Sequence, residues 1–152
     1  MIESDLQRLR VLDVARSWIR TPYHDLAEVK GHGADCATLL KAVYTEAGII
    51  EPFELPWYSP QWFLHQNDET YMAKVLQFSR EVEAPRPADV VLYRLKDYRT
   101  GKPLGRTFSH GGIVVHWPDR VIHAHKMSGM VLETGAFEAD LAGAETRFFS
   151  AW

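Results

Sequence analysis

Cys36, the only cysteine in the chain, stands where a glycine-rich run meets an apolar helical pattern. The run before it is Lys30–Asp35 (KGHGAD), and the apolar residues after it recur at three- and four-residue spacing until Gly48: Leu39, Leu40, Val43, Tyr44 and Ala47. This spacing predicts a helix over residues 36–47. A thiol in the first turn of a helix faces the positive end of the helix dipole, which favours the thiolate. The glycine-rich approach leaves space for another chain, so the pattern indicates a nucleophile.

Two structural interpretations of the same residues compete with this hypothesis. A lone cysteine is usually a small buried hydrophobic residue, and Asp35 is a common helix N-cap residue. A nucleophilic cysteine also needs a base, which His110, His123 or His125 could supply from far along the chain. The choice between packing and chemistry therefore depends on the neighbouring sequence.

Four short segments carry that further information, in chain order: residues 21–23 with 33–40 (TPY and GADCATLL), 87–93 (PADVVLY), 109–115 (SHGGIVV) and 121–124 (VIHA). Together they resemble the motifs of the NlpC/p60 cysteine peptidases, papain-like enzymes that cut peptide stems in bacterial cell walls. The resemblance extends from about Ile19 to Ala124, most of the chain. It implies an α+β, papain-like NlpC/p60 fold. In this fold, N-terminal helices pack on an antiparallel β-sheet, and the nucleophile lies at the N-terminus of one of these helices.

The resemblance also implies roles for individual side chains. Cys36 would be the nucleophile, and His110 would take its proton and return it to the leaving amine. His123 would orient His110, although His125 shares its expected face and could take its place. The hydroxyl of Tyr23 would lie beside the thiol. We expect the substrate to contact a further set of residues near the site: Asp35, His32, Trp62, Gly111 and His125. No cofactor is implied.

Residues 58–65 (YSPQWFLH) resemble the phage and prophage branch of the family, whose members are associated with tail tips. Three positions depart from the family pattern. Ala37 stands where many relatives carry serine, Ala88 where they carry a glycine before Asp89, and Gly111 where they carry an aliphatic residue. None of these changes removes a reacting group.

Composition limits the classes of protein to consider. With 152 residues, 46% apolar and 24% charged, we expect a single domain over residues 1–152 that buries roughly 70% of the unfolded chain's surface. The net charge of −3 and the lack of a long basic run make nucleic acid an unexpected partner. A single cysteine excludes an internal disulfide and a cysteine-rich zinc motif. The sequence also lacks the His-x-x-x-His spacing that would indicate a histidine metal site.

The N-terminal residues 1–6 (MIESDL) are acidic where a signal peptide is basic, and no apolar core follows them. No apolar run is long enough to span a membrane. We therefore expect a protein that is made in the bacterial cytoplasm, has no membrane partner and is carried to the cell wall by something else. The branch resemblance implies incorporation in a phage or phage-like tail particle, with tail-tip proteins as partners.

Helical spacing comes first along the chain and strand patterns follow, which is typical of an α+β fold. A first helix, from about Ser4 and ended by Pro22, would bury one broad apolar face: Leu6, Leu9, Leu12, Val14, Ala15 and Trp18. A later helix is expected over residues 68–80, after an ordered aromatic loop at 51–66. Strands are expected at residues 90–94, 112–116, 120–125, 130–133 and 146–150. Asp89 is expected to tie the turn before the first of these strands.

The turn between the two histidine strands decides whether His110 and His123 can meet. A four-residue turn at residues 116–119 pairs Val115 with Arg120 and puts His123 opposite Gly112. His110 and His123 are then diagonal neighbours on one face, within reach of each other. A three-residue turn would move His123 to the other face. The glycines at 111 and 112 would leave space for a thiol or substrate beside His110.

The resulting hypothesis is a cysteine endopeptidase that hydrolyses amide bonds in peptidoglycan stem peptides, next to γ-linked D-glutamate, as a tail-borne cell-wall hydrolase. Two alternatives remain open. The same site could serve an amidase or acyltransferase, because the motifs define the nucleophile and not the acceptor. The chain could also be a structural or assembly protein of a tail tip, in which cleavage is dispensable.

Overall fold

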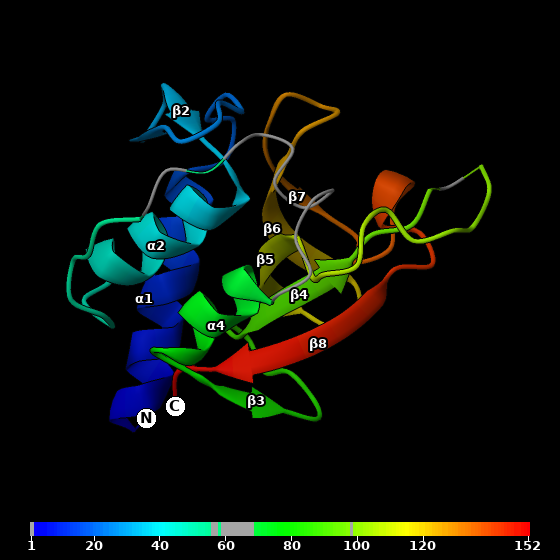
Figure 1. Ribbon diagram of the computed structural model, residues 1–152. Helices are drawn as coiled ribbons and strands as arrows, with labels where there is room; N and C mark the ends of the chain where they lie inside the picture. The colour runs from blue at the N-terminus through cyan, green and yellow to red at the C-terminus, as the bar shows by residue number, and fades with distance from the viewer. Residues whose placement is uncertain (1, 56–57, 59–68, 98) are drawn as a thin grey trace.

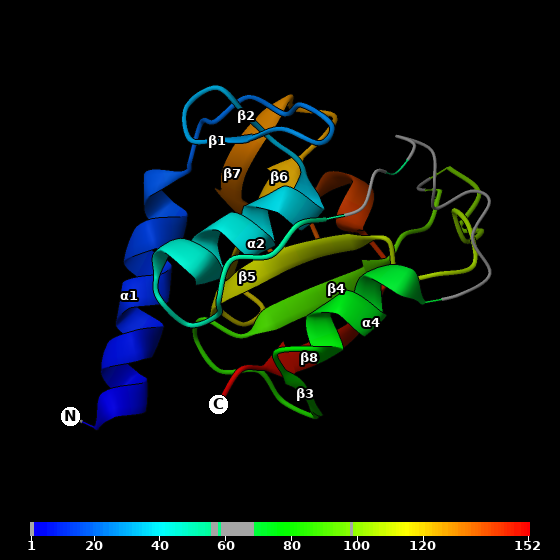
Figure 2. The same ribbon diagram turned by 60° about the vertical axis from the view of Figure 1, so that its left-hand side comes forward.

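A computed structural model describes residues 2–55, 58, 69–97 and 99–152. Within these ranges, one antiparallel sheet has six strands in the order β3-β8-β4-β5-β6-β7. The strands are β3 (Arg80–Val82), β4 (Val90–Arg94), β5 (His110–His116), β6 (Arg120–His125), β7 (Met130–Thr134) and β8 (Glu145–Ser150). Figures 1 and 2 show the described helices α1 (Glu3–Ser17), α2 (Cys36–Glu46) and α4 (Thr70–Leu76) on one side of this sheet. A small hairpin of β1 (Glu28–Val29) and β2 (Gly33–Ala34) precedes α2, and the whole is the expected α+β arrangement.

Most of the expected elements are present, with small differences at their ends. Strands β4 and β6 have the expected bounds, and helix α2 begins at Cys36 as predicted. Strand β5 begins two residues earlier than expected, at His110, so that this histidine lies within the sheet. Of the loop expected at 51–66, only residues 51–55 and 58 lie within the described part of the chain.

The helix expected over residues 68–80 was predicted too long. Helix α4 ends at Leu76, and the chain continues into β3, which pairs with β8 from Arg80 opposite Ser150. The β3 residues are exposed or half-buried, so this edge strand lacks the apolar alternation by which a sequence predicts a strand. The β1–β2 hairpin, with two residues in each strand, is too short to show any periodicity.

The sheet is covered on both faces. Val90 and Leu92 of β4 belong to the core shared with the helices, whereas Val91 and Tyr93 belong to a second core on the opposite face. Residues 135–144, which include the short 3₁₀-helix η1 (Ala139–Leu141), contribute apolar side chains to that second core. A central strand buried on both faces reads as a continuous apolar run, which explains the sequence of β4.

The buried face of α1 differs from the one expected. Leu6 and Leu9 are 48% and 49% exposed, so assigning them to the apolar face was wrong. The residues that α1 buries are Arg8, Val11, Leu12 and Ala15. A charged residue therefore lies on the inner face, where hydrophobic spacing alone could not place it, and it needs a partner.

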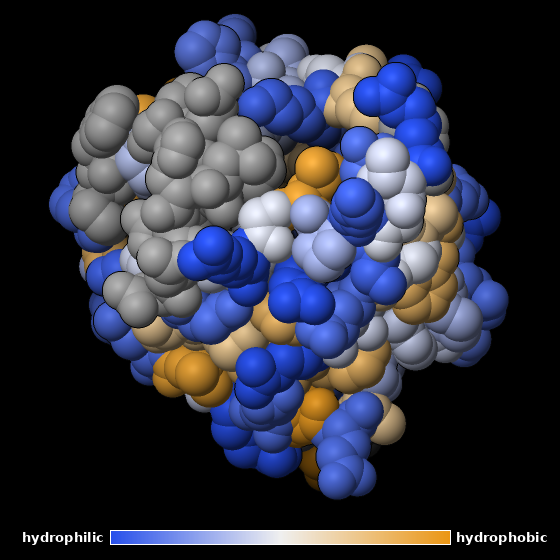
Figure 3. Space-filling view, turned by 45° about the vertical axis from the view of Figure 1, so that its right-hand side comes forward, coloured by the Kyte–Doolittle hydropathy of each residue, from blue (hydrophilic) through white to orange (hydrophobic). Residues whose placement is uncertain are grey.

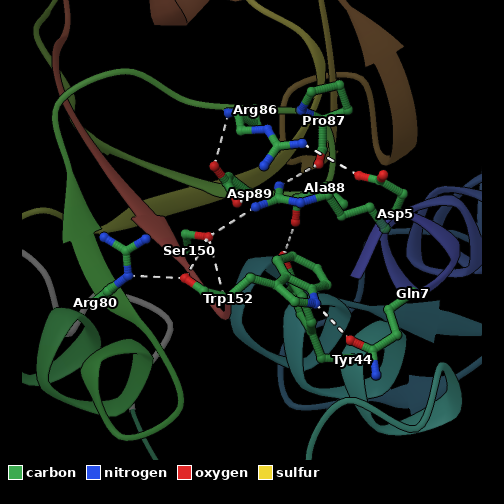
Figure 4. A network of polar contacts seen from close by, with 11 residues as sticks. Asp5, Gln7, Tyr44, Arg80, Arg86, Pro87, Ala88, Asp89, Ser150 and Trp152 are labelled. Carbon is green, nitrogen blue, oxygen red and sulfur yellow. Dashed lines mark hydrogen bonds and ion pairs between the residues drawn. The ribbon is translucent and has the colours of Figure 1, made fainter. Parts of the chain in front are cut away.

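Arg8 finds that partner in Asp89, just before β4, which Figure 4 labels beside Pro87 and Ser150. Arg8 Nη1 donates to Asp89 Oδ1 and to the Pro87 carbonyl oxygen, each at 2.8 Å, and Nη2 donates to Ser150 Oγ at 3.2 Å. The guanidinium also lies over the Trp152 ring, 4.2 Å from its centroid. These contacts join the first helix to the start of β4 and to the end of β8.

Asp89 ties the turn before β4, as predicted, because its Oδ2 accepts from the Arg86 N–H at 2.8 Å. Ala88, just before it, has a φ of +77°, in the left-handed region that favours glycine. The Tyr44 hydroxyl donates to the Ala88 carbonyl oxygen and holds this turn against α2. Ala88 therefore takes up a backbone conformation that glycine adopts more easily.

The face of the molecule turned to the viewer in Figure 3 carries mainly hydrophilic residues, with hydrophobic ones in small separate areas. The apolar residues of the sheet lie instead in the two cores. Among the helices of the described ranges, none is both long and apolar enough to cross a membrane.

Replacing Arg8 by leucine should lower the free energy of unfolding by about 3–5 kcal/mol, because it leaves the buried Asp89 carboxylate without its cation. Arg16→Leu, on the same helix, is the matched control. Arg16 is exposed and pairs with Glu133 at 3.5 Å, so its loss should cost about 1 kcal/mol or less. Urea unfolding followed by circular dichroism measures both, and equal losses would contradict a special role for Arg8.

Candidate active site

The start of α2 is held by the side chain of Asp35. Its Oδ1 accepts from the backbone N–H groups of Ala37 (3.0 Å) and Thr38 (2.8 Å), while Thr38 Oγ1 accepts from the Asp35 N–H at 2.8 Å. This capping box satisfies donors that the first turn of a helix leaves free. Asp35 Oδ2 also accepts from the Leu26 N–H at 2.8 Å, which ties the preceding loop to the cap. Cys36 is therefore fixed as the first residue of the helix.

The thiol of Cys36 is protonated at neutral pH. Burial raises the pKa of Cys36 to about 12, and the negative charge of Asp35 adds to the increase. Hydrogen bonds from Tyr71 and from the Gly111 backbone act in the opposite direction but do not outweigh it. The backbone N–H of Cys36 at the helix N-terminus lowers the thiol pKa, as expected, but burial outweighs this effect in the free protein. Cys36 Sγ lies 3.6 Å from the carbonyl oxygen of Ser109, which accepts from the thiol.

His110 and His123 lie in direct contact on neighbouring strands. His110 Nε2 is 2.9 Å from His123 Nδ1, and the ring planes meet at 86° with centroids 5.1 Å apart. Burial lowers the pKa of His110 to about 4, with a smaller effect of His125. Burial also lowers the pKa of His123 to about 2, helped by His110 and His125. Both imidazoles are consequently neutral at pH 7.

The turn that brings these strands together differs from the one expected. His116, not Val115, pairs with Arg120, so the turn is one residue shorter than predicted. A bulge between Val114 and His116 inserts one unpaired residue and restores the expected register from Val114 onward. The bulge thus keeps His123 on the face where it contacts the other histidine.

His125, the alternative partner of His110, is engaged elsewhere. Its Nδ1 lies 2.6 Å from Ser128 Oγ, and its Nε2 lies 2.7 Å from Asp140 Oδ1. The ring is 7% exposed and packs edge-on against His123, with centroids 5.3 Å apart. Both nitrogens of His125 are occupied, so the structure places His123 and not His125 against His110.

A cleft of about 300 Å³ opens over the thiol. Of the residues expected at the site, Cys36, His110, Tyr23 and Asp35 line it. His32 is exposed on the loop between β1 and β2 and does not line this cleft. The other expected residues lie elsewhere: Gly111 and His125 are buried behind the cleft, and Trp62 is outside the described residues.

Two further tyrosines, Tyr71 and Tyr58, bind the backbone and the cap next to the nucleophile. The Tyr71 hydroxyl donates to the Cys36 carbonyl oxygen at 2.9 Å and occupies the space above Gly111, where a Cβ would lie 2.6 Å from it. The Tyr58 hydroxyl donates to Asp35 Oδ2. The space at Gly111 is thus filled by Tyr71 and not by substrate, and this close approach explains why an aliphatic residue does not fit there.

Tyr23 lies in the cleft beside the thiol. Burial, and then the negative charges of Asp35 and Asp25, raise its pKa above the ordinary value, so the hydroxyl stays protonated at neutral pH. Its backbone N–H donates to the Gly129 carbonyl oxygen at 2.7 Å, which ties the Tyr23 backbone to the turn before β7. Tyr23 can therefore donate a hydrogen bond to a substrate but cannot act as an anionic base.

Two lysines, Lys96 and Lys126, line the cleft from different loops. Lys126 Nζ lies 6.0 Å from the centroid of the Tyr23 ring. Within the described residues neither lysine has an ion-pair partner, whereas Arg99 in the same wall pairs with Asp97. The cleft therefore offers two cations to an anionic group, although the carboxylates of Asp25, Asp35, Asp97 and Asp140 also line it. In the same described ranges, no group of three or more His, Cys, Asp or Glu is arranged to hold a metal ion.

A helix that begins with a cysteine and packs on an antiparallel sheet with a histidine pair is the expected arrangement of the papain-like α+β class. No model of a protein family and no curated protein sequence matches the chain. Solved structures do match it. NlpC2 from Trichomonas vaginalis has a TM-score of 0.60 at 13% identity, over 94% of this chain and 45% of that chain.

Two further structures resemble the chain over nearly its whole length. The NlpC/p60 domain of the peptidoglycan hydrolase SagA has a TM-score of 0.54 at 17% identity, over 92% of this chain and 96% of that chain. The peptidoglycan hydrolase RipB from Mycobacterium tuberculosis has a TM-score of 0.58 at 15% identity, over 99% of this chain and 68% of that chain. The chain spans only 42% and 45% of the length of the two Trichomonas proteins NlpC1 and NlpC2. These likenesses establish the NlpC/p60 fold.

Alkylation of Cys36 by iodoacetamide should speed up about tenfold per pH unit between pH 6 and 9, with no plateau. A thiol pKa of about 12 leaves the thiolate a small fraction that grows with pH throughout this range. A thiolate–imidazolium pair would instead give a constant rate around neutral pH, and that result would contradict the neutral site. Intact-protein mass spectrometry follows the rate, with Cys36→Ala as the control for reaction at other residues.

Proposed function

We propose that the chain is an NlpC/p60 cysteine endopeptidase that hydrolyses amide bonds in peptidoglycan stem peptides. The observation that carries the proposal is the cleft in which Cys36 and His110 both lie, with His110 hydrogen-bonded to His123. The NlpC/p60 fold supports the same substrate class, since the neighbours SagA and RipB are peptidoglycan hydrolases. A scaffold protein has no need for a cysteine and a histidine in one cleft with a second histidine bound behind the first.

The chemistry follows from a neutral thiol and a neutral imidazole. As Cys36 Sγ attacks the carbonyl carbon, its proton passes to His110, and the carbonyl oxygen becomes an oxyanion. His110 then gives that proton to the leaving amine, which leaves an acyl-enzyme thioester. A water molecule, deprotonated by His110, attacks the thioester and releases the new carboxylic acid and the thiol.

The first turn of α2 supplies a donor for the oxyanion. The Asp35 side chain occupies the N–H groups of Ala37 and Thr38, but within the described residues no acceptor outside Cys36 itself takes the Cys36 N–H. A backbone donor that is fixed in place and free of a strong partner is suited to stabilising negative charge in the transition state. The cap thus leaves the nucleophile's own N–H for the substrate.

Purified peptidoglycan and soluble stem peptides, incubated with the protein in ¹⁸O-water, should yield new stem fragments with one ¹⁸O in the new carboxyl group. Cys36→Ala should yield none, because it has no nucleophile. Mass spectrometry identifies the cleaved bond, and products joined to another amine without ¹⁸O would indicate an acyltransferase. No fragment from either protein, across several wall types, would contradict the proposal and favour a structural role at a tail tip.

The bond next to γ-linked D-glutamate is the proposed site of cleavage. That residue carries a free α-carboxylate beside the scissile amide, and Lys96 and Lys126 line the cleft without an ion-pair partner among the residues that the structure describes. A carboxylate held by an ammonium group gains a charge-assisted hydrogen bond that an amidated residue cannot form. The lysines thus favour an acidic stem peptide.

Lys126→Gln should lower kcat/KM about twofold to fivefold on a stem peptide with D-glutamate, the range expected for a solvent-accessible ion pair. On the matched peptide with D-isoglutamine, which lacks the carboxylate, the substitution should change little. Lys102→Gln, an exposed lysine outside the cleft, is the control. Equal effects on both peptides would show that Lys126 does not recognise the carboxylate.

We also propose that the hydrolase is delivered in a phage or phage-like tail, where it would contact tail-tip proteins and open the wall locally. The support for this is the sequence at 58–65, which resembles the tail-associated branch of the family.

A further inference from the structure

A chain of hydrogen bonds leads away from the His110 ring into the sheet. His110 Nε2 lies 2.9 Å from His123 Nδ1, and His123 Nε2 lies 2.9 Å from Thr134 Oγ1. Thr134 Oγ1 lies 2.9 Å from the carbonyl oxygen of Gly135. Thr134 ends β7 and pairs with Val121 of β6, so its position relative to His123 is set by the sheet.

The last acceptor in this series of hydrogen bonds sets the direction of every bond before it. The Gly135 carbonyl oxygen can only accept, so the Thr134 hydroxyl donates to it. Because that hydroxyl has one proton, its oxygen must accept from His123 Nε2–H. His123 then has a bare Nδ1, which accepts from His110 Nε2–H. The Nδ1 of His110 is left with a lone pair and no proton.

This order matters because both rings are neutral. Burial lowers the pKa of His110 to about 4 and that of His123 to about 2, so each ring keeps one proton at neutral pH. A neutral imidazole can carry that proton on either nitrogen. With the reverse order, His110 would carry its proton on Nδ1 and could not accept one there from a thiol.

We propose that Thr134 is a positioning residue that fixes the tautomers of His123 and His110, so that His110 offers the Nδ1 lone pair to the thiol of Cys36. This inference rests on the proposed function and adds one group to its site. In other triads a carboxylate or amide orients the base. Here a neutral histidine does so, and a neutral imidazole needs a further group to determine which nitrogen donates.

Nitrogen-15 NMR of the histidine rings in the whole protein tests the tautomers without any substrate. In the wild type, we expect both His110 and His123 to carry the proton on Nε2. Thr134→Val, which keeps the branched shape and removes the hydroxyl, should give a mixture of tautomers at His123, and Thr134→Ser should keep the wild-type state. A proton on Nδ1 of His110 in the wild type, or unchanged tautomers in Thr134→Val, would overturn the proposal.

Cleavage of a stem peptide gives a second readout. We expect kcat to fall about tenfold or more in Thr134→Val with little change in KM, and Thr134→Ser to restore it. Thr107→Val is the matched control, because Thr107 is 1% exposed and its hydroxyl has no hydrogen-bond partner within the described residues. Equal kcat values for Thr134→Val and the wild type would contradict the proposal.

A failure of the Thr134 variant to fold and a failure of the proposed function give different results. If Thr134→Val does not fold, Thr134→Ala and Thr134→Ser give the same comparison, since both lack the methyl group and differ by the hydroxyl. If the wild type cleaves no stem peptide, the proposed function fails, while the NMR result still decides the role of Thr134.

Discussion

The candidate site depends on the buried carboxylate of Asp35, which is 2% exposed. It accepts hydrogen bonds from the first turn of α2, from the Leu26 N–H in the preceding loop and from the Tyr58 hydroxyl. These bonds fix Cys36 at the first position of the helix and join the segments that form one wall of the cleft. The same negative charge adds to the effect of burial on the thiol. The group that positions the nucleophile therefore also helps to keep it protonated.

A protonated thiol beside a neutral imidazole makes proton transfer part of the attack itself. With the pKa of Cys36 at about 12 and that of His110 at about 4, a resting ion pair is unfavourable. The reaction then depends on geometry, namely on which ring nitrogen has the lone pair and which backbone N–H is free. Side chains that never touch a substrate gain importance for this reason: Thr134 through the histidine tautomers, and Tyr71 through its bond to the Cys36 carbonyl oxygen.

Much of the fold could be predicted from local patterns, since α2 shows helical spacing and β4 a continuous apolar run, and both lie where the sequence places them, as does β6. The predictions failed where burial does not follow hydrophobicity. On α1 the inward residue is Arg8, because Asp89 neutralises it, and Leu6 and Leu9 face outward. Strand β3 was missed because it lies at the edge of the sheet, where backbone pairing alone defines it.

The sequence by itself determined that Cys36 begins a helix and that two adjacent strands, one just after His110 and one containing His123, follow, because caps and apolar strand patterns are local properties of the chain. Only the tertiary structure decided which groups meet. The bulge after Val114 keeps the histidines on one face, and β7 brings Thr134 to the second of them. Such contacts depend on strand register and on packing between distant segments, which no short stretch of sequence encodes.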